Sequence, residues 1–232
     1  MGIAAFARGG SSTAGRLIRK PNISTGRAFN HDGNRSQLSH LMPASQQSFF
    51  EMQTSGPTGL SYAPDFISPE EEATLLAHIR KLPLVPFQFG RYEGKRRVIY
   101  FGHRYDFSHQ TLEDAAPIPC WLRPLSGRVE AFAGLPSGSI AHALLTEYKA
   151  GSGIGWHRDK KQFGKVFGVS LLSACPFRFR RKSGVKWERY ALDVQPRSLY
   201  TVDGEARNVW EHSIAPVKSP RYSITFRTLA EG

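Results

Sequence analysis

The stretch "RYSITFR", residues 221–227, decides how the rest of this 232-residue chain is interpreted. In a β-strand, successive side chains point to opposite faces, so Tyr222, Ile224 and Phe226 form one face, an ordinary apolar core face. The other face is polar and consists of Arg221, Ser223, Thr225 and Arg227. On an edge strand this polar face would meet solvent. In an interior strand it needs an anion nearby, because an unpaired buried charge costs several kcal/mol.

An anion would suit this polar face well. Two guanidinium groups that bracket two hydroxyls match a small dicarboxylate, since each guanidinium can hold a carboxylate through two hydrogen bonds. The strand therefore predicts either a solvated sheet edge or an interior site for a small diacid.

Short β-like runs separated by glycine and proline surround this strand, which predicts an antiparallel barrel or jelly-roll sandwich, mainly β with flanking helices. One helix precedes them, with Ser68 as N-cap, Pro69 at its first position and Glu71 completing a capping box. The runs are "VIYFG", "IAHALLTEY", "KVFGVSLL", "FRFRR", "ERYALDV", "SLYTV" and "RYSITFRTL".

The composition favours a polyanionic partner such as nucleic acid. Lys and Arg number 31 against 19 Asp and Glu, which gives a net charge of +12. Residues 1–51 contain six basic and two acidic side chains, or +4, so the remaining chain keeps +8. Two cysteines are too few for a disulfide scaffold. No apolar run approaches the roughly 20 residues of a membrane-spanning helix, so we expect no membrane association. We also expect a monomer.

Residues 1–55 are rich in Gly, Ser, Asn and Arg without helical or strand periodicity, and we expect a disordered basic tail before one domain at 56–232. An ordinary basic tail, or sequence upstream of a start at Met52, gives a cytoplasmic protein. The alternative is an organelle transit peptide, which is also Arg-rich and poor in acids.

The stretch "GWHRD", residues 155–159, indicates a metal site. In an extended segment His157 and Asp159 point to the same side. They supply two of the three ligands of the 2-His-1-carboxylate arrangement, which leaves open positions on Fe(II). Among eight histidines, His212 is the best remaining partner, because it lies in the β-rich half. A chance H-x-D is the alternative.

Taken in order, "LLTEYKAGSGIGWHRD", "PRSLYTVDGEARNVWEHSI" and "RYSITFR" resemble the AlkB family of Fe(II)- and 2-oxoglutarate-dependent dioxygenases. The resemblance covers about residues 60–230. It implies a double-stranded β-helix (jelly roll) preceded by a nucleotide-recognition lid.

The resemblance also implies the site and its reaction. His157, Asp159 and His212 would bind Fe(II), and Tyr148 and Arg221 the distal carboxylate of 2-oxoglutarate. Ser223 and Thr225 would complete that pocket, with Arg227 near the end that chelates iron. With O2, such enzymes oxidise a methyl group on a base of DNA or RNA and release succinate, CO2 and formaldehyde. The sequence departs from the family pattern at three positions. Thr146 and Ser223 bear on how 2-oxoglutarate is held, and Lys161 bears on which base is preferred.

The segment "GKRRVIYFGHRYDF" corresponds in place to the lid. Phe101, Tyr105 and Phe107 are separated by even numbers of positions, as stacking platforms on one face of a hairpin would be, and Lys95, Arg96 and Arg97 would meet phosphates. Arg97, Phe101, Tyr105 and Lys161 are the predicted substrate contacts. An aromatic core with a solvated cationic edge is the alternative. "FRFRRKSGVKWER" is a second candidate for backbone contacts, or a solvated hairpin.

Four functions remain open. The leading hypothesis is oxidative demethylation of N-alkylated bases in DNA or RNA. A tRNA-modifying hydroxylase or demethylase is the second, and a protein- or lipid-directed dioxygenase the third. A non-enzymatic nucleic-acid binder is the fourth. It is opposed by the joint presence of five side chains that a degenerate site would not need: His157, Asp159, His212, Arg221 and Arg227.

Overall fold

A computed structural model describes residues 56–89 and 91–230, all within one compact unit of the chain. The predicted tail at residues 1–55 and the alternative start at Met52 lie outside the described residues. None of the helices in the described part is both long and apolar enough to cross a membrane.

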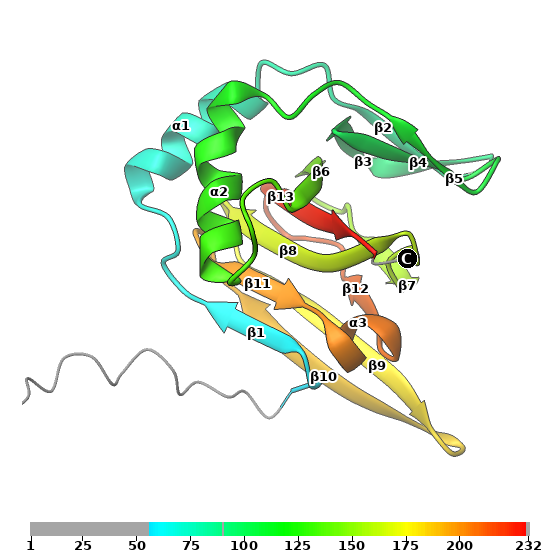
Figure 1. Cartoon of the computed structure of the whole chain (residues 1–232). Coiled ribbons are helices and arrows are strands. Elements are labelled where there is room, and N and C mark those ends of the chain that lie inside the picture. Colours follow the sequence, from blue (N-terminus) through cyan, green and yellow to red (C-terminus); the bar gives the residue numbers. More distant parts are fainter. Residues whose placement is uncertain (1–55, 90, 231–232) are drawn as a thin grey trace, which may run out of the picture. The chain divides into compact units, whose positions relative to one another are not determined.

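Seven antiparallel strands form the larger sheet, in the order β1-β11-β8-β13-β6-β3-β2 (Figure 1). All seven runs predicted from the sequence are strands of this sheet or of the smaller one. The larger sheet consists of β1 (Leu60–Ala63), β2 (Val85–Phe89), β3 (Tyr92–Phe101), β6 (Ile140–Tyr148), β8 (Phe163–Leu171), β11 (Leu199–Val202) and β13 (Arg221–Leu229).

Four strands form the smaller sheet, in the order β10-β9-β12-β7, and a separate hairpin contains two more. With the larger sheet they give the predicted jelly roll and its lid. The smaller sheet comprises β7 (Ile154–His157), β9 (Cys175–Ser183), β10 (Lys186–Val194) and β12 (Glu211–Ile214). The hairpin is β4 (His103–Asp106) with β5 (Thr111–Asp114), and the helices are α1 (Pro69–Ile79), a 3-10 turn (Cys120–Leu122), α2 (Arg123–Phe132) and α3 (Gly204–Asn208).

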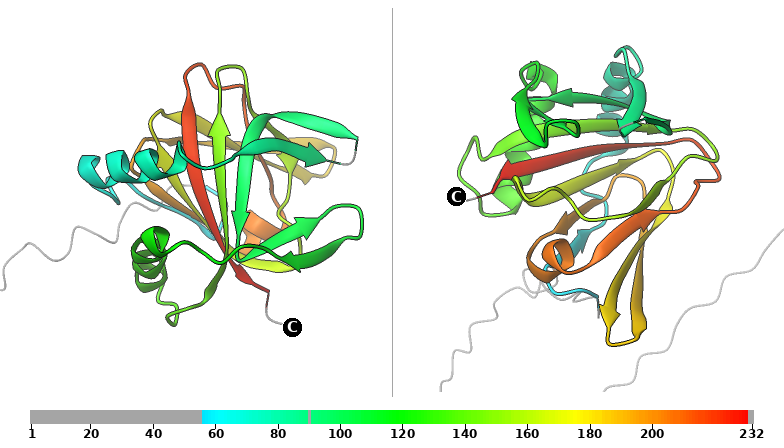
Figure 2. Two further views of the ribbon diagram at one scale, coloured as in Figure 1. Left: turned by 90° about the horizontal axis from the view of Figure 1, so that it is seen from above. Right: turned by 90° about the vertical axis from the view of Figure 1, so that its right-hand side faces the viewer.

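The strand β13 separates two hydrophobic clusters. Its apolar face, Tyr222, Ile224 and Phe226, packs in one cluster with buried leucines and isoleucines of α1 and α2. Its polar face points to the opposite side of the sheet, toward the second cluster between the two sheets. Figure 2 shows the helices α1 and α2 on one side of the larger sheet and the smaller sheet on the other. Because β13 pairs with both β6 and β8, the edge-strand interpretation is wrong.

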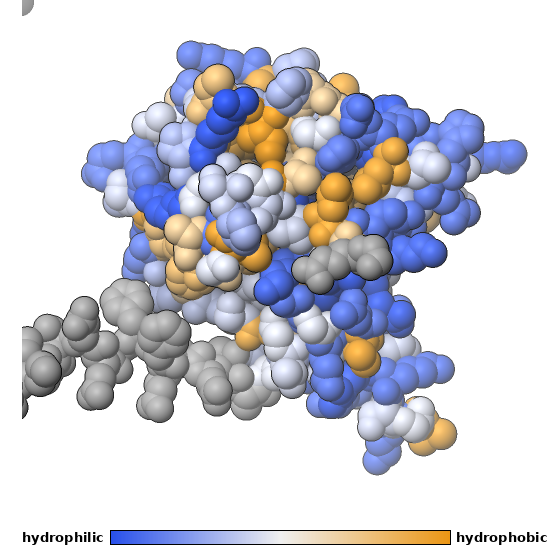
Figure 3. Space-filling view, in the orientation of Figure 1, coloured by the Kyte–Doolittle hydropathy of each residue, from blue (hydrophilic) through white to orange (hydrophobic). Residues whose placement is uncertain are grey.

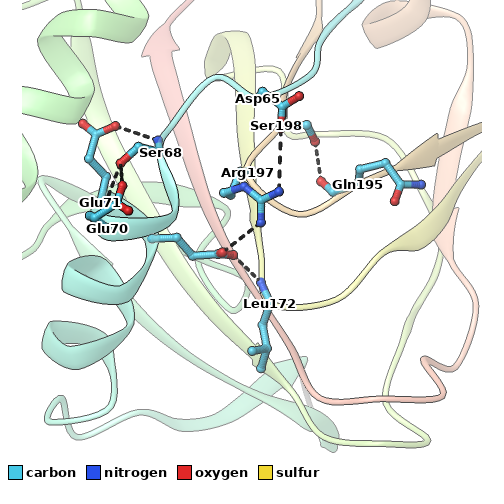
Figure 4. Close-up of polar contacts among 9 residues, drawn as sticks. Asp65, Ser68, Glu70, Glu71, Leu172, Gln195, Arg197 and Ser198 are labelled. Carbon is cyan, nitrogen blue, oxygen red and sulfur yellow. Dashed lines mark hydrogen bonds and ion pairs between the residues drawn. The ribbon is translucent and has the colours of Figure 1, made fainter. Parts of the chain in front are cut away.

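Helix α1 begins as the sequence predicts and is fixed to the sheets at its first turn (Figure 4). Ser68 Oγ accepts a hydrogen bond from Glu71 N, and Ser68 N donates to Glu71 Oε2, which is a complete capping box. The next residue, Glu72, accepts a hydrogen bond from Leu172 N at 2.7 Å and pairs with Arg197 at 3.5 Å. Both partners have positive φ, so Glu72 stabilises two strained loop positions at once.

Gly102 ends β3 and allows the chain to turn into the lid. Its φ is 78°, and a Cβ built there would lie 2.0 Å from the carbonyl oxygen of Ala141. We expect Gly102→Ala to destabilise the fold by about 3 kcal/mol, a loss of roughly 10 °C in Tm by calorimetry. Gly127→Ala is the matched control, because a Cβ there meets nothing within 4 Å and helix α2 should gain about 0.5–1 kcal/mol. Equal Tm values for the two variants would contradict this reason for the glycine.

Candidate active site

A cavity of about 510 Å³ opens between the two sheets, beneath the hairpins β2–β3 and β4–β5. Most of the residues predicted to act in one site line it together. The predicted residues in its wall are Tyr105, Tyr148, His157, Asp159, His212, Thr225 and Arg227. The neighbouring strands therefore present metal, co-substrate and lid residues to a single enclosed space, as an enzyme site requires.

His157 and His212 lie directly opposite each other on the antiparallel strands β7 and β12. Their ring centroids are 4.4 Å apart, although 54 residues, 158–211, separate them in the chain. His157 Nδ1 lies 2.9 Å from the carbonyl oxygen of Gly155. Because a carbonyl only accepts, Nδ1 carries a hydrogen, and Nε2 is the ring nitrogen of His157 that could bind a metal.

Asp159 completes the group just beyond the end of β7. Its Oδ2 lies 3.4 Å from Nε2 of His212, and its Oδ1 pairs with Nη2 of Arg227 at 2.7 Å. Burial alone would raise the pKa of the Asp159 carboxyl, but Arg227, His212 and His157 hold that pKa well below its usual range. Burial lowers the pKa of His212 to about 3, so this imidazole is neutral, the form in which histidine binds metals.

His142 is a site residue that the sequence reasoning missed. It is 1% exposed, and its Nδ1 lies 2.7 Å from the carbonyl oxygen of His103 in the lid. The opposite ring nitrogen, Nε2, must then accept the 2.9 Å hydrogen bond from Nη1 of Arg227. His142 thus holds Arg227, which holds Asp159. The available signal was its even spacing from Tyr148 along "IAHALLTEY", which places both side chains on the cavity face of β6.

Arg221 occupies the interior, as one of the two interpretations of its strand predicts. It is 1% exposed, its Nε donates to Ser170 Oγ at 3.3 Å, and its guanidinium carbon lies 5.0 Å from the Tyr148 ring centroid. Both remaining nitrogens, Nη1 and Nη2, are buried without a hydrogen-bond partner among the described residues. Such a group strongly favours an anion, because a fork of two parallel donors matches one carboxylate.

The donors present therefore fit Fe(II) and 2-oxoglutarate. Two imidazoles and one carboxylate oxygen are the ligand types that non-heme iron prefers. The unpartnered fork of Arg221 fits the far carboxylate of a diacid. Ser223 is buried between Thr146 and Ser170 in the sheet and is not part of the cavity wall, whereas Thr225 is.

The lid differs from the sequence predictions at three positions. Phe101 is buried in the cluster beneath the helices, so its predicted stacking role is wrong. The positive φ of Gly102 interrupts the strand, and the even spacing from Phe101 to Tyr105 does not carry across it. Arg97 pairs with Glu147 on the opposite face of β3, and Lys161 is exposed outside the cavity wall.

The sequence neighbours of Arg97 and Lys161, which are Arg96 and Lys160, lie beside aromatic rings of the cavity, in the place expected of a substrate contact. Arg96 lies over the Phe87 ring at 3.7 Å, and Lys160 Nζ lies 4.9 Å from the Tyr105 ring centroid and 5.1 Å from that of Phe107. All five line the cavity. Cations therefore do contact aromatic rings in the lid, but through Arg96 and Lys160, which are the sequence neighbours of the predicted Arg97 and Lys161.

A second cluster of potential metal ligands lies in the lid hairpin and was not predicted. Ligand atoms of Asp106, His109 and Glu113 all lie within 4.8 Å of one another. The ligand atoms of His157, Asp159 and His212, which are also described residues, do not all lie within this distance of one another. The lid cluster has protein partners, however. Asp106 binds His109 at 2.5 Å, and Glu113 pairs with Arg104.

Comparison with known proteins defines the class. Residues 59–227 match the family model of the 2OG-Fe(II) oxygenase superfamily, and the chain belongs to that superfamily. Within it the chain is AlkB-like. It is 27% identical over 180 residues to the "Alkylated DNA repair protein ALKBH8 homolog" of Arabidopsis thaliana, with 67% of this chain and 50% of that protein covered.

Other relatives support the same placement. The "tRNA (carboxymethyluridine(34)-5-O)-methyltransferase ALKBH8" of Mus musculus is 31% identical over 170 residues, which cover 70% of this chain and 25% of that protein. The chain thus spans half or less of these two relatives. The structure of OsALKBH1 shares the fold, with a TM-score of 0.61 at 15% identity over 76% of this chain and 99% of that one.

Proposed function

We propose that this oxygenase oxidises an alkyl group on a modified base of DNA or RNA, with N-methyl groups leaving as formaldehyde. The observation that carries the proposal is the charge of the cavity wall. Four cations line it against two carboxylates, a net charge of +2: Arg96, Arg158, Lys160 and Arg227 against Glu93 and Asp159. Fe(II) would add two positive charges and the 2-oxoglutarate dianion would remove two. The cavity would then still favour an anionic substrate such as a nucleotide.

The aromatic rings of the lid support the same substrate class. Phe87, Phe89 and Tyr105 each lie 5.0–5.7 Å from Phe107, centroid to centroid, and all four line the cavity. An enzyme that acts on a base must take it out of the stack and hold it between planar groups. A neutral protein or lipid substrate would have no use for the surplus cations.

Iron and 2-oxoglutarate, when bound, would supply the chemistry that activates O2, with one oxygen atom going to the alkyl carbon and the other to 2-oxoglutarate, which would leave as succinate and CO2. The chain's own residues would bind and orient. Arg221 and Tyr148 would hold the diacid, Arg227 would fix the carboxylate of Asp159, and His142 would fix Arg227. The lid would stack the base and exclude bulk water from the cavity.

A tRNA-modifying hydroxylase or demethylase is the second candidate, favoured by the similarity to the mouse relative, whose name describes a tRNA-modifying enzyme. Mass spectrometry on methylated DNA and RNA oligonucleotides and on tRNA, with iron, 2-oxoglutarate and O2, tests both. Loss of a methyl group with formaldehyde supports demethylation, and a retained oxygen atom on a tRNA base supports hydroxylation. Succinate release without change in any nucleic acid would contradict both.

Lys160 and Lys161 provide a matched pair for the substrate prediction. We expect Lys160→Met to raise the KM for an oligonucleotide substrate about tenfold, because one charge-assisted contact is worth about 1.5 kcal/mol or more. Lys161→Met removes the same charge outside the cavity and should change this KM less than twofold. The KM for 2-oxoglutarate should stay constant in both, and equal oligonucleotide KM values would contradict the role of Lys160.

A further inference from the structure

The outer face of the smaller sheet, turned away from the cavity, is rich in cations and tryptophans. Along β9, Phe177 and Phe179 point inward, with ring centroids 5.3 and 6.1 Å from that of His212. The alternate residues of β9 therefore point outward, together with their neighbours on β7 and β10. We call this surface the outer platform: Trp156, Arg178, Arg180, Lys182, Trp187 and Arg189.

A cation–aromatic stack gives the outer platform a fixed shape. The guanidinium of Arg180 lies between two indoles, 4.4 Å from the Trp156 centroid and 4.3 Å from that of Trp187. Arg178 adds a contact to Trp156 at 5.2 Å, and Lys182 adds one to Trp187 at 5.8 Å. Residues from three strands are thus held together on one face, and little side-chain freedom remains to be lost on binding.

The charge of the outer platform is only partly neutralised by the protein. Arg180 pairs with Glu211 at 2.7 Å, and Arg178 donates to the hydroxyl of Ser213. Lys182 and Arg189 are exposed and form no ion pair within the described residues. Figure 3 shows hydrophilic groups along the protruding β9–β10 hairpin, with a hydrophobic group at its tip. Free cations beside aromatic rings are the features that hold single-stranded nucleic acid without reading its sequence.

The outer platform adjoins the candidate active site at one strand. Trp156 and His157 are consecutive on β7, so they point to the outer platform and to the cavity respectively. No strand of the described residues pairs with the other side of β7, which ends the smaller sheet. A nucleic-acid strand with one base in the cavity can therefore pass over this free edge onto the outer platform.

We propose that the outer platform binds the strand that flanks the target base, and so gives this enzyme a preference for longer single-stranded substrates. This proposal rests on the proposed function. It predicts that affinity increases with the length of the flank, whereas a cavity-only enzyme would bind a short and a long oligonucleotide about equally.

The test compares two double variants with the same loss of charge. Lys182→Ser with Arg189→Ser removes the free cations of the outer platform. Lys81→Ser with Arg123→Ser removes two exposed cations at α1 and α2, on the opposite side of the molecule (Figure 1). Binding of labelled methylated single strands of about 5 and about 20 nucleotides is measured by fluorescence anisotropy over a range of salt concentrations.

For the long strand, the outer-platform variant should bind about tenfold more weakly, and the slope of log K against log [salt] should fall by about 1.4, or about 0.7 per lost phosphate contact. Binding and turnover of the short strand should not change. The control variant should bind both strands like the wild type. Equal long-strand affinity and slope in the two variants would overturn the proposal. Wild-type protein that binds and oxidises neither strand would instead contradict the proposed function.

Discussion

Replacing Asp159 by asparagine should abolish iron-dependent succinate release, with a loss of at least 100-fold in Mn(II) affinity. The side chain keeps its shape and an oxygen for Arg227 but loses the charge that a ferrous ion needs. Asp159→Ala should have the same effect on turnover. It should also destabilise the fold by about 2–3 kcal/mol, because it leaves the part-buried guanidinium of Arg227 without its carboxylate. Titration calorimetry with Mn(II) measures the loss of metal affinity, and a succinate assay measures the loss of turnover.

Asp106→Asn is the control for this prediction, since Asp106 belongs to the lid cluster. It should leave turnover and one high-affinity metal site unchanged. Nucleic-acid binding should survive in Asp159→Asn, because the cations of the cavity and surface remain. If nucleic-acid binding disappeared together with turnover while the protein stayed folded, Asp159 would have a structural role instead.

Removing the Arg221 guanidinium should produce opposite effects on binding and on stability. Arg221→Met should raise the KM for 2-oxoglutarate by about 100-fold or more, because a buried bidentate pair with the carboxylate is lost. The same change should raise the Tm of the free protein, because it removes a buried cation with two unpartnered nitrogens. Arg221→Lys should recover only part of the affinity, since it cannot offer the fork. Equal KM values in all three forms would rule out the carboxylate role.

Much of the fold follows from periodicity and caps. The alternation in "RYSITFR" correctly separates a helix-facing side from a polar interior side, and Ser68 to Glu71 correctly marks the start of α1. The short strands β1, β2, β5 and β12 were not predicted, and the segments of β4 and β7 were expected to be extended but without bounds. Four or five residues contain too few alternations to stand out, and their pairing partners are distant in the chain.

The site was harder to predict where a local backbone change matters. Side-chain direction beyond Gly102 depends on a positive φ that spacing alone does not give, which is why Phe101 was assigned to the wrong face. Past the end of β7, the alternation likewise could not decide between Lys160 and Lys161. His142 could not be recognised from its sequence neighbours, because none of them is acidic. Its partners in the structure are Arg227, 85 residues away, and the carbonyl oxygen of His103 in the lid.

The central claim is that His157, Asp159 and His212 bind one ferrous ion, and that the unpartnered guanidinium of Arg221 binds the far carboxylate of 2-oxoglutarate. A crystal structure of the protein with Mn(II) and a non-reactive 2-oxoglutarate analogue tests it most directly. We expect one metal ion bound to these three side chains, with the far carboxylate of the analogue on Nη1 and Nη2 of Arg221. Mn(II) bound only to Asp106, His109 and Glu113, with Arg221 still unpartnered, would contradict the account.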